Sequence, residues 1–172
     1  MSTESPVAAP RAAQPLWPRT LLLAVAAIES MSGLSNSVIL FGDMSEVPGP
    51  GLGGLLIKIS LALHPLFAVA ALVFVSIGWI SQAILALAAV LVIEWLSILP
   101  SAVHHGLDFQ GPGAVFSTIY FLALPALALA AAALVWRHSP RQILPVLLVS
   151  IPTLAGMAGF AAFALGVMIY GF

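Results

Sequence analysis

Glutamate occurs twice in the same short pattern, each time within a run that is otherwise almost entirely apolar. The pattern, Ile-Glu-x-x-Ser-x-Leu, covers residues 28–34 and again residues 93–99. A charged side chain at the centre of a bilayer-spanning helix costs between about 3 and ~10 kcal/mol, so it faces protein or water and is often paired or protonated. Glu29 and Glu94 therefore predict a polar site that takes up protons or binds a cation.

Other polar residues follow these two glutamates at helical spacing. Ser32 and Asn36 lie three and seven residues after Glu29, and Ser97 lies three residues after Glu94. On a helix, such residues form one polar stripe, which a bundle interior accommodates better than lipid does. The stripe fits either a proton- or cation-binding site or a structural set of interhelical hydrogen bonds.

One histidine lies deep inside an apolar run. His64 directly precedes Pro65, which disfavours helical geometry at the preceding residue and predicts a kink. Imidazole changes its charge close to neutral pH, so a histidine near Glu29 can relay protons or bind a ligand. The alternative interpretation is a core histidine with satisfied hydrogen bonds.

A second group of histidines lies between apolar runs. His104, His105 and Asp108 form the pattern His-His-x-x-Asp, and Glu46 is an acid in another predicted loop. Together they are a candidate zinc or copper site, whereas a hydrated interfacial loop is the alternative. Haem held by two histidines fits poorly, because His64 is the only histidine inside a predicted span. No cofactor is therefore predicted.

The composition decides the class of protein. Of 172 residues, 62% are hydrophobic and only 6% are charged, whereas soluble domains carry about 25% charged residues. This excludes a soluble fold. The formal net charge of -1 provides no basic surface for nucleic acid. The absence of cysteine excludes disulfides, iron–sulfur clusters and thiolate metal sites.

The apolar runs predict an all-α polytopic membrane protein. A run of about twenty residues, rising 1.5 Å per residue in a helix, crosses the roughly 30 Å hydrocarbon core. Residues 1–19, rich in Pro, Ala and Ser, are predicted to form a mobile cytoplasmic tail. The region 20–172 is then one transmembrane domain with five expected spans: about 20–41, 54–76, 81–99, 115–136 and 143–170.

The arginines predict the orientation of these spans. Basic residues are retained on the cytoplasmic side, and all four arginines fall on one side of a five-span chain: Arg11, Arg19, Arg137 and Arg141. The amino terminus is thus expected inside and the carboxyl terminus outside, in a bacterial inner membrane. Lys58, in the first outer turn of the second span, is interpreted as a snorkelling side chain. A cleaved amino-terminal signal is the alternative reading of the first span.

The two glutamate patterns belong to longer similar stretches. Each is followed by a loop that contains an acid, two further residues and Gly-Pro-Gly, and residues 28–74 then run parallel to residues 93–134. This order predicts a tandem repeat of parallel helical hairpins, related by a pseudo-twofold axis along the membrane normal. A chance match within a biased composition is the alternative.

The fifth span lies outside the repeat. Ala158, Ala162 and Gly166 recur every four residues along it, a spacing that allows close helix–helix packing. The lipid bilayer is the first expected partner. This face is the expected contact with a further copy of the chain or with a larger membrane complex.

Three classes of function remain open. No motif for nucleotides, phosphates, zinc proteases or serine hydrolases is present, which favours a protein that is not an enzyme. The first class binds or translocates protons, ions or a small solute. The second is a non-catalytic accessory or structural subunit of a larger membrane complex, and the third is a metal- or haem-binding membrane protein.

Overall fold

All regular elements in the part of the chain that the structure describes are helical. The computed structural model describes residues 16–41, 51–106, 114–137 and 142–171. These ranges contain α1 (Trp17–Ser37), the short 3-10 helix η1 (Val38–Phe41), α2 (Leu52–Ser76), α3 (Ile80–His105), α4 (Ala114–Trp136) and α5 (Ile143–Tyr170). The five α-helices are long and apolar enough to cross a membrane. This confirms the expected all-helical fold with five candidate spans and suggests a membrane location.

The third helix is longer than the sequence predicts. It continues through Pro100 to His105, whereas its span was expected to end at Leu99. Proline removes one helical hydrogen bond, but membrane helices tolerate it where neighbouring helices pack against it. Here Gly53 of α2 packs closely enough that an added Cβ would lie 3.2 Å from the Cβ of Pro100. The helices α2, α4 and α5 likewise continue through internal prolines.

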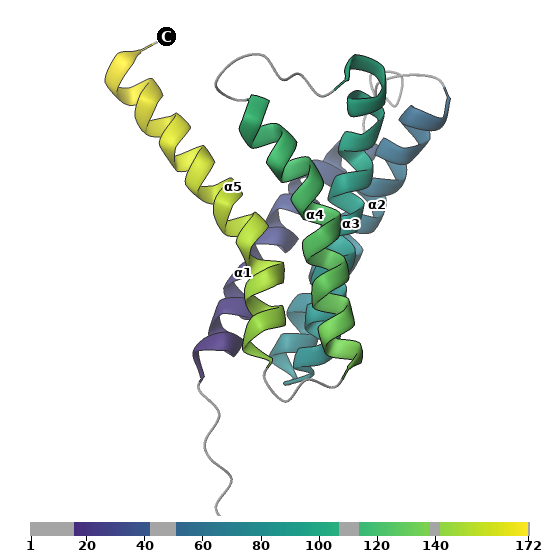
Figure 1. Ribbon diagram of the computed structural model, residues 1–172, viewed down its shortest axis with the longest axis vertical. Coiled ribbons are helices and arrows are strands. Elements are labelled where there is room, and N and C mark those ends of the chain that lie inside the picture. Colours follow the sequence, from purple (N-terminus) through teal and green to yellow (C-terminus); the bar gives the residue numbers. More distant parts are fainter. Residues whose placement is uncertain (1–15, 42–50, 107–113, 138–141, 172) are drawn as a thin grey trace, which may run out of the picture.

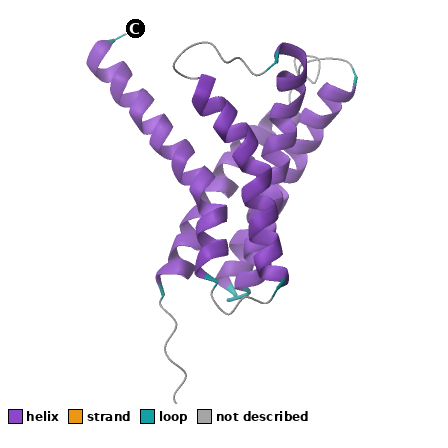
Figure 2. Ribbon diagram, in the orientation of Figure 1, coloured by secondary structure: helices purple, strands orange, loops and turns teal. Residues whose placement is uncertain are grey.

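Successive helices run in opposite directions along the bundle (Figure 1). Each helix packs against the next in the chain, and α5 also contacts α1, so the five helices form a closed set of neighbours. The described chain therefore starts at one end of the bundle and finishes at the other (Figure 2). We call the end with Trp17 and Trp136 the closed end, and the end with Gly51 and Gly106 the open end.

The apolar core occupies the half of the bundle next to the closed end. It includes Leu22 of α1, Val75 of α2, Ile84 of α3, Ala131 of α4 and Val146 of α5, which are all fully buried. These residues fall in the first halves of the odd-numbered helices and in the second halves of the even-numbered ones. Because the helices alternate in direction, tight packing is concentrated at one end (Figure 1).

Polar contacts join helix ends at the closed end. The Arg19 guanidinium donates a hydrogen bond to the carbonyl of Ser76, at 2.7 Å. A cation suits this position, because the last carbonyls of α2 carry partial negative charge. The Gln142 side chain donates to the Ser81 hydroxyl at 3.2 Å and so connects the starts of α5 and α3.

The outer half of α5 diverges from the other helices (Figure 1). Its side chains are exposed, including Phe160, Phe163 and Met168. An added Cβ at Gly159 or Gly166 would meet nothing within 4 Å. Ala158 and Ala162 of the predicted small-residue face are exposed, and Gly166 is partly exposed.

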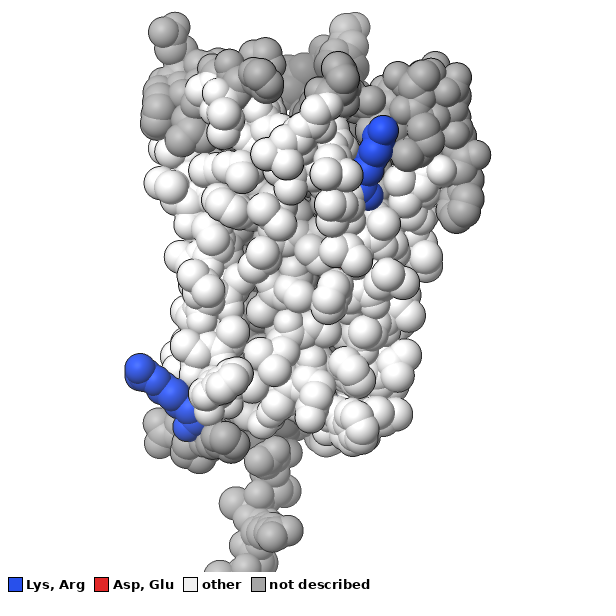
Figure 3. All heavy atoms as spheres, turned by 90° about the vertical axis from the view of Figure 1, so that its right-hand side faces the viewer, with Lys and Arg blue, Asp and Glu red and all other residues white. Residues whose placement is uncertain are grey.

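The exposed surface is overwhelmingly apolar. In Figure 3, basic side chains are seen on the displayed face only towards its two ends, and between them the described surface is uncharged. Lipid tails rather than water match such a surface.

Candidate functional site

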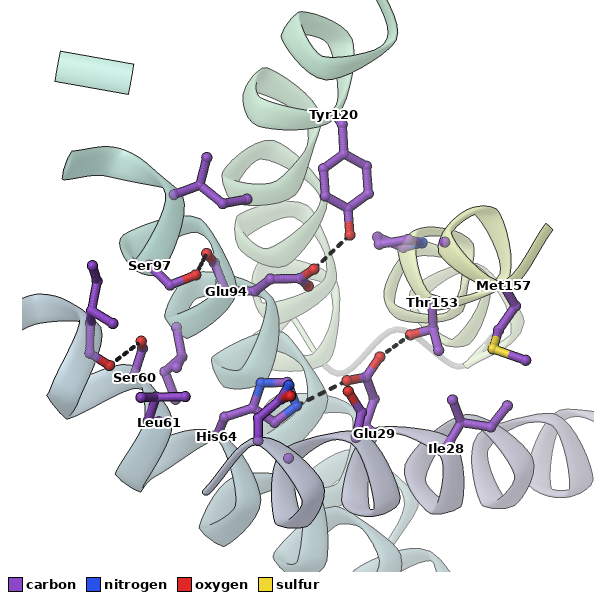
Figure 4. A pocket seen from close by; sticks show the side chains of 18 residues that line it. Ile28, Glu29, Ser60, Leu61, His64, Glu94, Ser97, Tyr120, Thr153 and Met157 are labelled. Atoms are coloured by element: carbon purple, nitrogen blue, oxygen red, sulfur yellow. Dashed lines mark hydrogen bonds and ion pairs between the residues drawn. The ribbon is translucent and has the colours of Figure 1, made fainter. Parts of the chain in front are cut away.

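A cavity of about 560 Å³ lies between the apolar core and the open end. Residues from all five α-helices line it. In Figure 4, His64 and Thr153 point towards Glu29, and Tyr120 points towards Glu94. This volume is typical of small-molecule sites, which fall between roughly 300 and 1,000 Å³. The polar lining residues are Glu29, Ser32, Asn36, Ser60, His64, Glu94, Ser97, Tyr120 and Thr153.

Glu29 is the most fully bonded polar group of the cavity. The Thr153 hydroxyl donates to its Oε1 at 2.6 Å, and Nε2 of His64 lies 3.0 Å from its Oε2 (Figure 4). The exposed fractions of the two side chains are 11% for Glu29 and 16% for His64. If Nε2 of His64 carries a hydrogen, the imidazole donates to this oxygen, and if it does not, Nε2 can accept from a protonated carboxyl group. Side chains from α1, α2 and α5 thus meet at one carboxyl group.

A glycine allows α1 and α2 to approach closely at this point. Gly33 lies one helical turn after Glu29, and an added Cβ there would come within 2.7 Å of Cδ2 of His64. The same atom would lie 3.0 Å from the backbone of Pro65. The missing side chain of Gly33 therefore makes room for His64 beside Glu29.

The proline next to His64 leaves a backbone acceptor beside the cavity. Pro65 has no N–H, so the carbonyl of Leu61, four residues earlier in α2, cannot receive its usual helical hydrogen bond. Leu61 is itself a lining residue of the cavity. A bound ligand that donates hydrogen bonds can use this oxygen.

Glu94 is bonded to the fourth helix. The Tyr120 hydroxyl donates to its Oε1 at 2.7 Å (Figure 4). Ser97 does not contact this carboxyl group and instead donates to the backbone carbonyl of Glu94, at 2.7 Å. Tyr120 is thus the described hydrogen-bond donor that orients the Glu94 carboxyl group.

Carboxyl groups outnumber basic groups in the described lining of the cavity. Glu29 and Glu94 are the described lining residues that become negative, His64 is the one that becomes positive, and neither Lys nor Arg is among them. Ser32 and Asn36 line the cavity while remaining exposed, so the cavity is accessible from outside the bundle. The arrangement suits a ligand that is positively charged or rich in hydrogen-bond donors.

The structure brings the six predicted proton- or ligand-binding residues to one cavity. Glu29, Ser32 and Asn36 come from α1, His64 from α2, and Glu94 and Ser97 from α3. Binding of a ligand by these residues remains a prediction.

The structure does not describe the side chains of the predicted metal ligands. Glu46 and Asp108 and the side chains of His104 and His105 lie outside the described residues. Within the described part of the chain, no group of three or more His, Asp or Glu side chains is arranged to hold a metal ion. The metal hypothesis is therefore untested.

Sequence reasoning missed Thr153, Tyr120 and Gly33. Thr153 and Tyr120 are polar residues inside apolar spans, which is the same signal that identified Glu29. Their partners could not be predicted, because Thr153 and Glu29 are 124 positions apart. Gly33 carries no signal of its own in a chain with 14 glycines.

In each predicted repeat unit the glutamate contacts the helix that follows it. In the first hairpin Glu29 of α1 meets His64 of α2, and in the second Glu94 of α3 meets Tyr120 of α4. The tandem repeat itself remains a hypothesis. Comparison of the chain with protein-family models, curated proteins and solved structures finds no match. The proposed function therefore rests on the residues that line the cavity.

Proposed function

We propose that this chain is a small multi-pass membrane protein that binds a cationic solute between Glu29 and Glu94 and exchanges it for protons. The observation that carries this proposal is the presence of both carboxyl groups in one cavity whose described lining contains neither Lys nor Arg. An uncompensated charge away from water costs several kcal/mol. Two carboxylates in one site therefore favour compensation by a cation or by protons.

The groups around the cavity support an exchange of this kind. The titratable side chains that face it are Glu29 from α1, His64 from α2, Glu94 from α3 and Tyr120 from α4. Helix α5 contributes Thr153, which donates a hydrogen bond without titrating. A cation bound between the carboxylates neutralises their charge in place of protons, so its binding releases protons.

The proposed direction of access is from the outer side. The arginine distribution favours a cytoplasmic amino terminus, and with five spans this orientation directs the open end outwards. The apolar core then separates the cavity from the cytoplasm. Transport, as opposed to binding alone, requires the packing at the closed end to open as well.

Proton release on cation addition tests the proposal. Purified protein in weakly buffered mild detergent is mixed with ethylammonium chloride, which is small enough for the cavity. We expect protons to be released, and we expect Glu29→Gln and Glu94→Gln each to reduce the release by at least half. Arg137→Gln, which removes an exposed charge near the closed end, is the matched control. Equal release from the wild type and both glutamine variants would contradict the proposal.

Flux in liposomes then separates transport from binding. An inward gradient of ethylammonium should drive protons out of liposomes that contain this chain alone. Binding without flux would limit the function to a receptor or sensor of the cation.

The outer half of α5 supports a second candidate function, that of an accessory subunit or homo-oligomer. On its face with Ala158, Ala162 and Gly166 both alanines are exposed, and an added Cβ at Gly166 would meet nothing within 4 Å, so another helix can pack there. In this case Glu29 acts only as an interhelical hydrogen-bond acceptor. Purification in mild detergent tests it: a stoichiometric partner, or a stable oligomer that Ala162→Leu dissociates, favours this candidate.

A further inference from the structure

An apolar groove adjoins the polar cavity between α4 and α5. Its volume is about 140 Å³, and apart from Tyr120 its walls consist of Ala, Leu, Ile and Pro. Tyr120 and Pro152 line both the groove and the cavity, so the two spaces are adjacent. Ala123 and Leu127 of α4 face Ile151 and Ala155 of α5 among the lining residues of the groove.

The groove lies at the outer surface of the bundle. Two of its lining residues, Ile119 and Ile151, are 61% and 49% exposed. Beyond them α5 diverges from the other helices (Figure 1), and an added Cβ at the cavity-lining Gly156 would meet nothing within 4 Å. In a bilayer this side of the cavity faces lipid tails, so a ligand can enter from the lipid.

We propose that the physiological ligand is an amphiphilic amine, with its ammonium group between Glu29 and Glu94 and its apolar chain in the groove between α4 and α5. This inference rests on the proposed cation site and names the class of cation that it takes. Tyr120 joins the two parts, because its hydroxyl donates to Glu94 while its residue also lines the groove.

Charge and size both support this class of ligand. An ammonium head group donates several hydrogen bonds and complements two carboxyl groups, whereas an anionic head group is repelled by them. A dry apolar cavity of about 150 Å³ accommodates a benzene molecule. The groove, at about 140 Å³, therefore has room for roughly six carbon atoms of an apolar chain.

Two amines of different chain length test the inference. Binding of ethylammonium and hexylammonium is measured on full-length protein in lipid nanodiscs, with empty nanodiscs subtracted to remove partitioning into lipid. Each buried methylene strengthens binding roughly fourfold, so we expect hexylammonium to bind at least tenfold more tightly than ethylammonium. The groove-filling variant Ala123→Leu should reduce this ratio to about twofold or less and leave ethylammonium binding unchanged.

Two further variants serve as a control and as a second test of the groove. Ala126→Leu makes the same change at an exposed position of α4 outside the groove and should retain the wild-type ratio. Ala155→Leu narrows the groove from α5 and should act like Ala123→Leu, which keeps the test decisive if one variant does not fold.

The outcomes separate the two proposals. If folded groove variants retain the wild-type ratio while Glu94→Gln abolishes binding of both amines, the groove is not the chain site and the cation site stands. If neither amine binds to the wild type, the cation site fails and the amphiphile inference fails with it.

Discussion

The imidazole Nε2 of His64 lies 3.0 Å from Oε2 of Glu29, although 35 positions separate the two residues in the chain. The other carboxyl oxygen of Glu29 accepts a hydrogen bond from Thr153, so one carboxyl group connects α1 with α2 and α5. This relationship gives Glu29 a structural role in addition to its proposed role in cation binding. The two roles can be separated by substitutions that keep or remove its hydrogen bonds.

Glu29→Gln should unfold at nearly the wild-type temperature, whereas Glu29→Leu should be clearly destabilised. Glutamine retains an acceptor for Thr153. Leucine leaves both Thr153 and His64 without a hydrogen-bond partner at position 29, at a cost of about 1–3 kcal/mol per buried polar group. Thermal unfolding in detergent measures the difference. Two variants of equal stability would show that the contacts of Glu29 with Thr153 and His64 do not support the fold.

Gly33→Ala should destabilise the protein by about 1–3 kcal/mol, as expected for overpacking. The new methyl group would come within 2.7 Å of His64 and 3.0 Å of the Pro65 backbone, so α1 and α2 must separate. Gly159→Ala, where an added Cβ meets nothing within 4 Å, is the matched control and should be neutral or slightly stabilising.

A double variant isolates the part of this clash that involves the imidazole. The variant Gly33→Ala/His64→Ala should lose less stability than the sum of the losses of the two single variants, because removal of the ring relieves part of the clash. If the double variant loses the sum of both single effects, the crowding lies entirely at the Pro65 backbone.

Affinity for ethylammonium should fall as the pH falls. Protons and the cation compete for the same carboxyl groups, so each displaced proton weakens apparent binding by up to tenfold per pH unit on the acidic side of the titration. Calorimetric titrations at several pH values, in buffers of different ionisation enthalpy, measure both affinity and proton release. A pH-independent affinity with no proton release would mean that the cation binds elsewhere.

Reporter fusions should place the two ends of the chain on opposite sides of the membrane. Fusions after Asp43 and Gln110 and at the carboxyl terminus should report an outside location, and a fusion after Ser139 an inside location, because segments that carry arginine are retained on the cytoplasmic side. An inside signal from the fusion at Gln110 would reverse the proposed access to the cavity.

The sequence alone determined the class of the protein and the identity of its most unusual polar groups. Five apolar runs with little charge favour helices that are long and apolar enough to cross a bilayer, because each helix satisfies its own backbone hydrogen bonds. Glu29, His64 and Glu94 were recognisable because polar side chains are costly in such helices and require a partner. These inferences depend only on local properties of the chain.

The tertiary structure decided which partner each group has. Thr153 and Tyr120 bond to Glu29 and Glu94 because α5 and α4 pack beside them, and that packing depends on side-chain shape across the whole bundle. The same packing places the apolar core at the closed end and the cavity beyond it, a distinction that the high hydropathy of each of the five helices does not reveal. Gly33 is the clearest case, because His64 of a neighbouring helix occupies the space that a side chain at this position would need.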